Sequence, residues 1–190
     1  MAALGLVSFT PNRGVRVRTL SREELREAFL VRAELESLAT ELATARMTPS
    51  DLAALEAAEE RFASLTERLL QRVHEHTEDR RIVADWVRAN HAFHDVIYAA
   101  AQAPLVEQLA KDERRTFLSQ GIWAAGSGLD ELYELNAAQH RAIRHAIGAQ
   151  NPQGARALAR EHVLHSGRLL EASLDQVEVR QRRRRRRRAS

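Results

Sequence analysis

The sequence has 190 residues, of which 44% are hydrophobic and none is cysteine. This length allows one buried core with small appendages, and the absence of cysteine excludes disulfides and thiolate metal sites. Seven of the 29 basic residues form one arginine run at positions 182–188, and against 26 acidic residues the rest of the chain is mildly acidic. No apolar stretch reaches the roughly 18 residues of a membrane span and no signal peptide is apparent, so we expect a cytoplasmic protein without a membrane partner.

Residues 1–20 favour a short β-hairpin. GLVSF and VRVRTL alternate like two short strands, and the turn-forming cluster TPNRG lies between them. Two strands alone are barely stable, so we expect this segment to belong with another structure. Arg13, Arg16 and Arg18 are candidates for contacts with DNA phosphates, which would position the protein without specifying a sequence.

The segment 21–174 predicts an all-α fold, an antiparallel bundle of six or more helices, because Ala, Leu, Glu and Arg dominate it. Ser21 with Glu24 is a capping box, and Thr48-Pro49 and Asn151-Pro152 are further helix starts. The expected helices span about 22–45, 49–74, 80–101, 104–120, 129–149 and 152–174. The arginine-rich tail, 175–190, is predicted to be disordered through self-repulsion. It is either an incidental tail, which we favour, or a source of nonspecific nucleic-acid affinity.

Three histidines and one asparagine fall on the apolar faces of these helices. Asn90 and His94 lie one turn apart in NHAFH, His140 follows in QHRAIRHAI, and His162 in AREHVLHS. Neutral imidazole is a common ligand of divalent transition metals, and burying four polar groups is costly unless they are satisfied together. We therefore predict one metal site, the alternative being core histidines that hydrogen-bond to their neighbours. The other histidines are expected at the rim or in solvent: His74, His76, His91, His145 and His165.

The order of these motifs resembles the C-terminal effector-binding FCD domain of FadR-type GntR transcription regulators. VRAELESLATELA and the Asn-Pro helix start also match, and the resemblance covers about residues 21–174. In the metal-binding branch of that family an Asp and three His hold one divalent ion beneath a pocket for a small organic acid. The resemblance thus implies Asn90, His94, His140 and His162 as ligands of a divalent metal ion. Zn or Ni is expected first because the set is nitrogen-rich, and Mn stays possible.

Asn90 departs from the family pattern, which has Asp at this position. An amide oxygen can coordinate but brings no negative charge. We expect either weaker metal binding or a greater dependence on a carboxylate effector. Arg32, in VRAELE, is a candidate partner for that carboxylate, with an ordinary ion pair to Glu36 as an equally weighted alternative.

GLVSFTPNRGVRV resembles the wing of the N-terminal winged helix-turn-helix of GntR regulators. The helices that precede the wing in that family are not part of this sequence. Two explanations stay open: the start of the protein was assigned too late in the sequence, or the protein is a truncated regulator. Sequence-specific DNA binding is expected only with those helices present.

The sequence thus predicts a ligand-sensing domain of a GntR regulator, in which a metal-anchored acid changes the spacing of DNA-binding heads in a homodimer. A metalloenzyme is one alternative, disfavoured because no HExxH occurs and no Glu stands three residues before any His. A purely structural or dimerisation module is the other. We expect no enzymatic activity.

Overall fold

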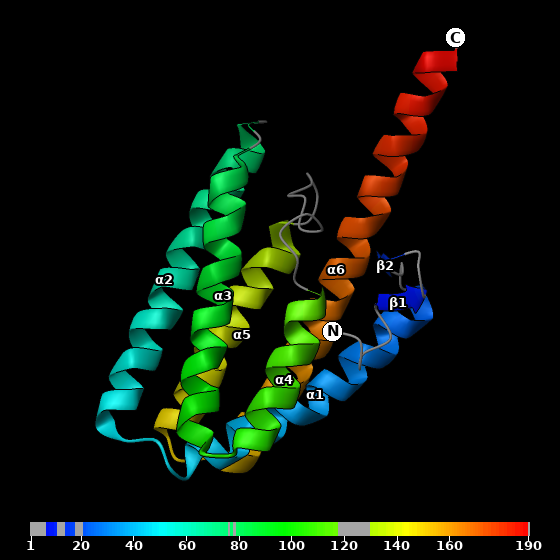
Figure 1. Cartoon of the computed structure of the whole chain (residues 1–190). Helices are drawn as coiled ribbons and strands as arrows, with labels where there is room; N and C mark the ends of the chain where they lie inside the picture. The colour runs from blue at the N-terminus through cyan, green and yellow to red at the C-terminus, as the bar shows by residue number, and fades with distance from the viewer. Residues whose placement is uncertain are drawn as a thin grey trace.

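The computed structural model describes residues 7–10, 14–17, 21–75, 77, 79–117 and 130–189. Six helices and one hairpin make up this part of the chain (Figure 1). The helices are α1 (Arg22–Thr44), α2 (Pro49–His74), α3 (Arg80–Ala101), α4 (Pro104–Phe117), α5 (Asp130–Gly148) and α6 (Pro152–Ala189). The strands β1 (Val7–Thr10) and β2 (Gly14–Val17) pair antiparallel, with Val7 opposite Val17.

Local capping explains where the first helices begin. The Ser21 side chain accepts a hydrogen bond from the Glu24 amide, and Thr48 does the same with the amide of Asp51 at the start of α2. Both capping boxes are complete, so the predicted starts of α1 and α2 are confirmed. Asp79, a signal the sequence reading did not use, accepts hydrogen bonds from the first amides of α3.

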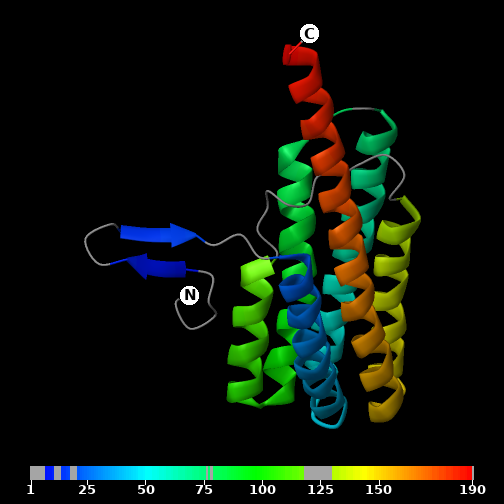
Figure 2. The same ribbon diagram turned by 90° about the vertical axis from the view of Figure 1, so that its right-hand side faces the viewer.

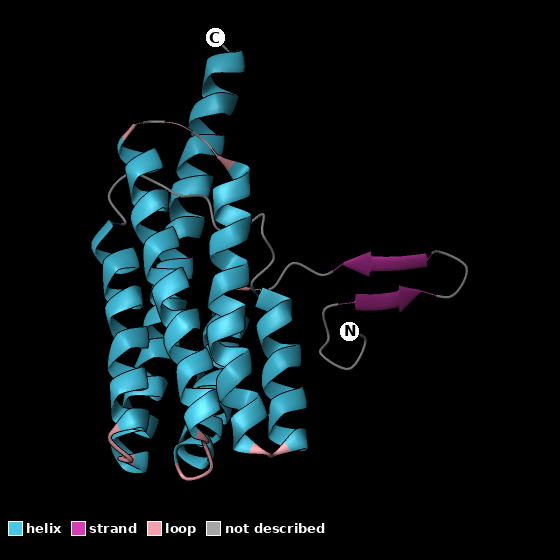
Figure 3. Cartoon of the chain, turned by 90° about the vertical axis from the view of Figure 1, so that its left-hand side faces the viewer, coloured by secondary structure: helices cyan, strands magenta, loops and turns pink. Residues whose placement is uncertain are grey.

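The helices pack as one bundle. α1 contacts α3, α4 and α6, while α2 contacts α3 and α5, and α5 also contacts α6. Figures 2 and 3 show the helix axes running roughly side by side, with the hairpin drawn to one side of the bundle. Within the described residues no helix is long and apolar enough to cross a membrane.

Two hydrophobic clusters fill the interior, one above the other. One contains Phe62, Trp86 and Tyr133, and the other contains Phe93 and Ile143. Along each of five helices a polar residue lies at the boundary between the clusters. We call this set the polar layer, and it consists of Glu36 on α1, Glu59 on α2, Asn90 and His94 on α3, His140 on α5 and His162 on α6.

The sixth helix differs from the prediction. It continues to Ala189 instead of ending near Leu174, so residues 175–189 are helical in the structure and not a disordered tail. Arginine is a good helix former, and extending an existing helix needs no new nucleation. The prediction of a disordered tail considered only the repulsion between the arginine charges.

His165 is a second correction. It is buried, and its Nε2 lies 3.1 Å from the carbonyl oxygen of Leu132, although helical periodicity placed it at the rim. The reason is that α6 packs against both α1 and α5, which widens its buried arc. Of the others, His74 and His145 are exposed and His91 is half-buried as expected, whereas His76 lies outside the described residues.

Candidate metal centre and effector site

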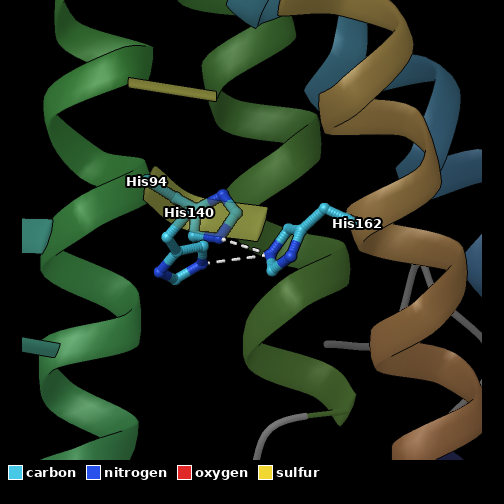
Figure 4. Close-up of side chains that lie close together, drawn as sticks. All are labelled: His94, His140 and His162. Atoms are coloured by element: carbon cyan, nitrogen blue, oxygen red, sulfur yellow. Dashed lines mark hydrogen bonds between the residues drawn. The ribbon is translucent and has the colours of Figure 1, made fainter. Parts of the chain in front are cut away.

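Three imidazoles from three helices converge within the polar layer (Figure 4). Nε2 of His162 lies 3.1 Å from Nε2 of His140 and 3.3 Å from Nε2 of His94. One ligand atom from each ring lies within 4.8 Å of the other two, and all three residues are buried. The prediction that these histidines point inward and meet is confirmed by this geometry.

Hydrogen bonding among the three rings cannot satisfy them all. A neutral imidazole has one donor nitrogen and one acceptor nitrogen, and a single shared proton serves only one pair of facing Nε2 atoms. Nδ1 of His140 also has no hydrogen-bond partner among the described residues. A divalent cation would accept the lone pairs of all three Nε2 atoms together, so the donor set fits a metal ion.

Glu36 lies against the ring of His94. Its Oε2 lies 3.0 Å from Nδ1 of His94, and both side chains are buried. A proton on Nδ1 leaves the Nε2 lone pair directed at the other two rings. The sequence reading considered Glu36 only as a partner for Arg32, because the contact to α3 depends on how α1 packs.

Burial and charge set the protonation states. Burial, helped by the Arg114 guanidinium, lowers the pKa of His94 to about 4, and burial holds the pKa values of His140 and His162 well below the usual range. Burial raises the pKa of Glu36, but the Arg32 charge and the His94 hydrogen bond together hold it well below its usual range. At neutral pH the site therefore contains three neutral imidazoles beside one carboxylate.

Aromatic rings hold the His140 side chain in place. Its ring stacks on Phe93 with centroids 4.0 Å apart and planes 12° apart, and Phe62 lies 4.4 Å away on centroids. This packing leaves the imidazole few alternative rotamers. The convergence of the three imidazoles is thus supported by the apolar core on either side of the polar layer.

Asn90 lies beside the cluster, but its amide oxygen already has a partner. Nη2 of Arg114 donates to Oδ1 of Asn90 and also to the Asn90 backbone oxygen, at 2.8 Å for the latter. Arg114 is fully buried on α4. The sequence reading missed it, although its spacing of four residues from the buried Ala110 was an available signal.

Arg32 is also buried, and it forms the ion pair that was one of its two predicted roles. Its Nε and Nη2 donate to Oε1 of Glu36 at 3.0 and 2.8 Å, and its guanidinium lies 4.5 Å from the centroid of the Phe29 ring. Nη1 has no hydrogen-bond partner among the described residues. Arg32, Asn90, His94 and His162 line a small internal cavity of about 10 Å³. That is room for about one water-sized group.

The predicted DNA-contacting arginines are only partly described. Arg13 and Arg18 lie outside the described residues, and Arg16 lies on β2 opposite Ser8.

In helical bundles, ligand and metal sites are built in the core from side chains on facing helices, as these three histidines are placed. The chain belongs to the FCD domain family, whose model matches residues 27–165. Proteins of this family are effector-sensing transcription regulators of the GntR type and not enzymes, which confirms the family predicted from the sequence.

Solved structures share the fold at low sequence identity. A structure of McbR/YncC from E. coli superposes with a TM-score of 0.68 at 20% identity, covering 90% of this chain and 79% of that one. Lar, described as controlling the agr system of Listeria monocytogenes, gives 0.64 at 13% identity, covering 90% and 75%. A GntR-family transcriptional regulator from Pseudomonas syringae pv. tomato gives 0.56 at 16%, covering 92% and 67%. No curated protein matches the chain.

Proposed function

We propose that this chain is the ligand-sensing domain of a GntR-family transcription regulator and that it binds one divalent metal ion through His94, His140 and His162. The observation that carries the proposal is the convergence of three buried Nε2 atoms whose lone pairs cannot satisfy one another. Zn or Ni suits these three nitrogen ligands best, and Mn stays possible. The bound ion would supply positive charge that anchors an acidic effector.

Asn90 is the proposed fourth ligand. Its Oδ1 has a second lone pair beyond the one that Arg114 occupies, so coordination does not require the hydrogen bond to break. The adjacent guanidinium and the neutral amide both weaken cation binding at this position. The proposed consequence is weaker metal affinity than an Asp would give.

A small carboxylate effector balances the charge of the loaded site. Arg32 and Arg114 carry two positive charges and Glu36 one negative charge, so a divalent ion raises the local excess further. Buried charge of this kind is stable only when it is compensated. Arg32 is a proposed effector contact through Nη1, the part of its guanidinium that Glu36 does not use.

The bundle architecture supports a proposed route for signal transmission. Metal and acid draw together helices that are far apart in sequence, and α1, which carries Arg32 and Glu36, leads back to the hairpin segment. We take β1 and β2 as the wing, with Arg13, Arg16 and Arg18 near DNA phosphates.

The proposal also includes a homodimer in the cytoplasm. Leu105 and Leu109 are exposed one turn apart on α4 and offer an apolar stripe for a second copy.

Metal analysis of purified protein tests the proposal. Protein prepared without chelator or a histidine tag should contain about one divalent ion per chain by mass spectrometry, and alanine substitution of His94, His140 or His162 should each remove most of it. His91→Ala is the matched control, because this histidine lies on α3 about one turn before His94 but is not in the cluster. Metal-free wild type that is not stabilised by Zn or Ni would favour the structural module instead.

A further inference from the structure

A second hollow lies on the α4 side of the polar layer, between α3 and α4. It has a volume of about 210 Å³ and is lined by His91, Asp95, Lys111 and Arg114. We propose that this outer pocket binds a small oxyanion through Arg114 and Lys111, and that its occupancy strengthens cation binding at the three histidines. The pocket itself stands on its own observations, and only the coupling rests on the proposed function.

Arg114 is the reason to expect an anion here. The side chain is 1% exposed, and its Nη2 donates to two acceptors, both of them on Asn90. Its Nε and Nη1 have no hydrogen-bond partner in the part of the chain that the structure describes. A buried guanidinium with unmet donors is costly, and a carboxylate or an inorganic oxyanion supplies the missing acceptors. Because Arg114 also lines the outer pocket, an acceptor bound there would reach it.

Size separates the two cavities. The inner one, beside the histidines, has room for about one water-sized group at about 10 Å³, whereas the outer one has about 210 Å³. Among the described residues the outer pocket has room for a small organic acid as it stands, whereas the inner cavity would have to widen before the proposed effector could bind beside the metal. The metal-side cavity and the oxyanion pocket are therefore neighbouring sites, separated by the contact between Asn90 and Arg114.

Two further lining residues of the outer pocket are charged: Lys111 is a second cation, and Asp95 is an anion that affects which ligands bind. Nζ of Lys111 lies 2.6 Å from a Glu107 oxygen and 3.6 Å from Oδ1 of Asp95, so it is held at the rim but remains partly exposed. Asp95 repels a second negative charge at that wall. The pocket should therefore prefer a small monoanion, such as acetate, over a dianion such as malonate or sulfate.

The Asn90–Arg114 contact provides the coupling. Nη2 of Arg114 donates to Oδ1 of Asn90, the proposed fourth ligand, so its positive charge lies beside the histidine cluster and disfavours a metal cation there. An oxyanion on Arg114 neutralises this charge. Cation and oxyanion should then bind cooperatively, and each should raise the affinity for the other by the same factor.

The direct test uses the whole chain, stripped of metal with a chelator. Lys111 is the only lysine in the sequence, so amine-reactive labelling followed by peptide mass spectrometry reports on this pocket apart from the N-terminus. Acetate, titrated against sodium chloride at constant ionic strength, should slow Lys111 labelling and raise the melting temperature, with malonate and sulfate binding more weakly. Labelling and melting that do not respond to any of the three anions would overturn the proposal.

Variants separate this site from the histidine cluster. Lys111→Gln and Arg114→Gln should each weaken acetate binding by roughly tenfold or more, the loss expected for one charge-assisted hydrogen bond. Arg168→Gln, which removes an exposed positive charge on α6, should leave it unchanged. If Arg114→Gln fails to fold, Lys111→Gln alone decides. Acetate binding that survives Lys111→Gln unchanged contradicts the pocket.

The coupling has its own readout. With a competing metal-binding dye, saturating acetate should tighten Zn binding several-fold in the wild type and much less in Lys111→Gln. His140→Ala should abolish metal binding and keep acetate binding. Loss of both in His140→Ala would place the anion at the histidines and overturn the outer pocket, whereas acetate binding in a wild type that takes up no metal would leave the pocket intact and refute the proposed metal site.

Discussion

Replacing Glu36 by glutamine isolates the role of one buried carboxylate. Glu36 is 1% exposed and lies between the Arg32 guanidinium and Nδ1 of His94. In Glu36→Gln the amide oxygen would still accept from Arg32, but the NH₂ group would face Nδ1 and favour the tautomer with its proton on Nε2. That proton occupies the lone pair that a metal needs, so affinity should fall by about 10- to 100-fold, or about 1.4–2.7 kcal/mol.

The same substitution should also destabilise the metal-free fold. Breaking a buried ion pair leaves Arg32 without a countercharge, which costs about 3–5 kcal/mol in comparable cases. Urea unfolding of chelator-treated protein measures this cost, and a competition titration with a metal-binding dye measures the affinity separately. Metal affinity within about twofold of the wild type would refute the argument that Glu36 sets the tautomer of His94.

Glu59→Gln is the matched control. Glu59 is also a buried carboxylate of the polar layer, at 3% exposure, but it pairs with Arg141 and Arg144 at 3.4 and 3.2 Å and not with a histidine. It should lower the free energy of unfolding while leaving metal affinity unchanged. Equal loss of metal affinity in both variants would mean that general destabilisation, and not the Glu36–His94 contact, explains the effect.

Three further outcomes are expected. Asn90→Asp should tighten metal binding by roughly tenfold in buffer without organic acids, with a smaller gain under saturating carboxylate, and equal affinity of the two proteins by dye competition would defeat the charge argument. Because the folded-state pKa of His94 is about 4 against an ordinary 6.5, the unfolded chain binds more protons between those values, so the stability of the metal-free protein should fall by roughly 2 to 3 kcal/mol from pH 7 to 4.5. Urea unfolding at several pH values checks this, and a flat profile would mean that His94 protonates in the folded state. Deleting the seven arginines at 182–188 should lower the slope of log affinity for duplex DNA against log salt by up to about 6, and an unchanged slope would show that they do not contact phosphates.

The part of this protein that local sequence determines is extensive. Helix starts at Ser21 and Thr48 follow from capping side chains that bond within three residues, and the inward direction of His94, His140 and His162 follows from helical periodicity. Both signals are readable because the interacting atoms are close in the chain. The spacing of these histidines was also specific enough to indicate the family.

Other features depended on which helices meet. The Glu36–His94 contact joins α1 to α3, and the Arg114–Asn90 contact joins α4 to α3, so neither has a signature within one helix. His165 was placed at the rim because periodicity describes a single buried face, whereas α6 is covered by two neighbours. The volumes of the two cavities likewise come from side chains of several helices.

The sequence by itself determined that polar groups would be buried inside a helical bundle, because they lie on the apolar faces of their helices. Only the tertiary structure decided how they are paired. In the packed bundle Glu36 contacts both Arg32 and His94, and Arg114 donates a hydrogen bond to the side-chain oxygen of Asn90. The physical reason is that hydrogen bonds and charge pairing act over a few ångströms between segments whose separation the chain order does not fix.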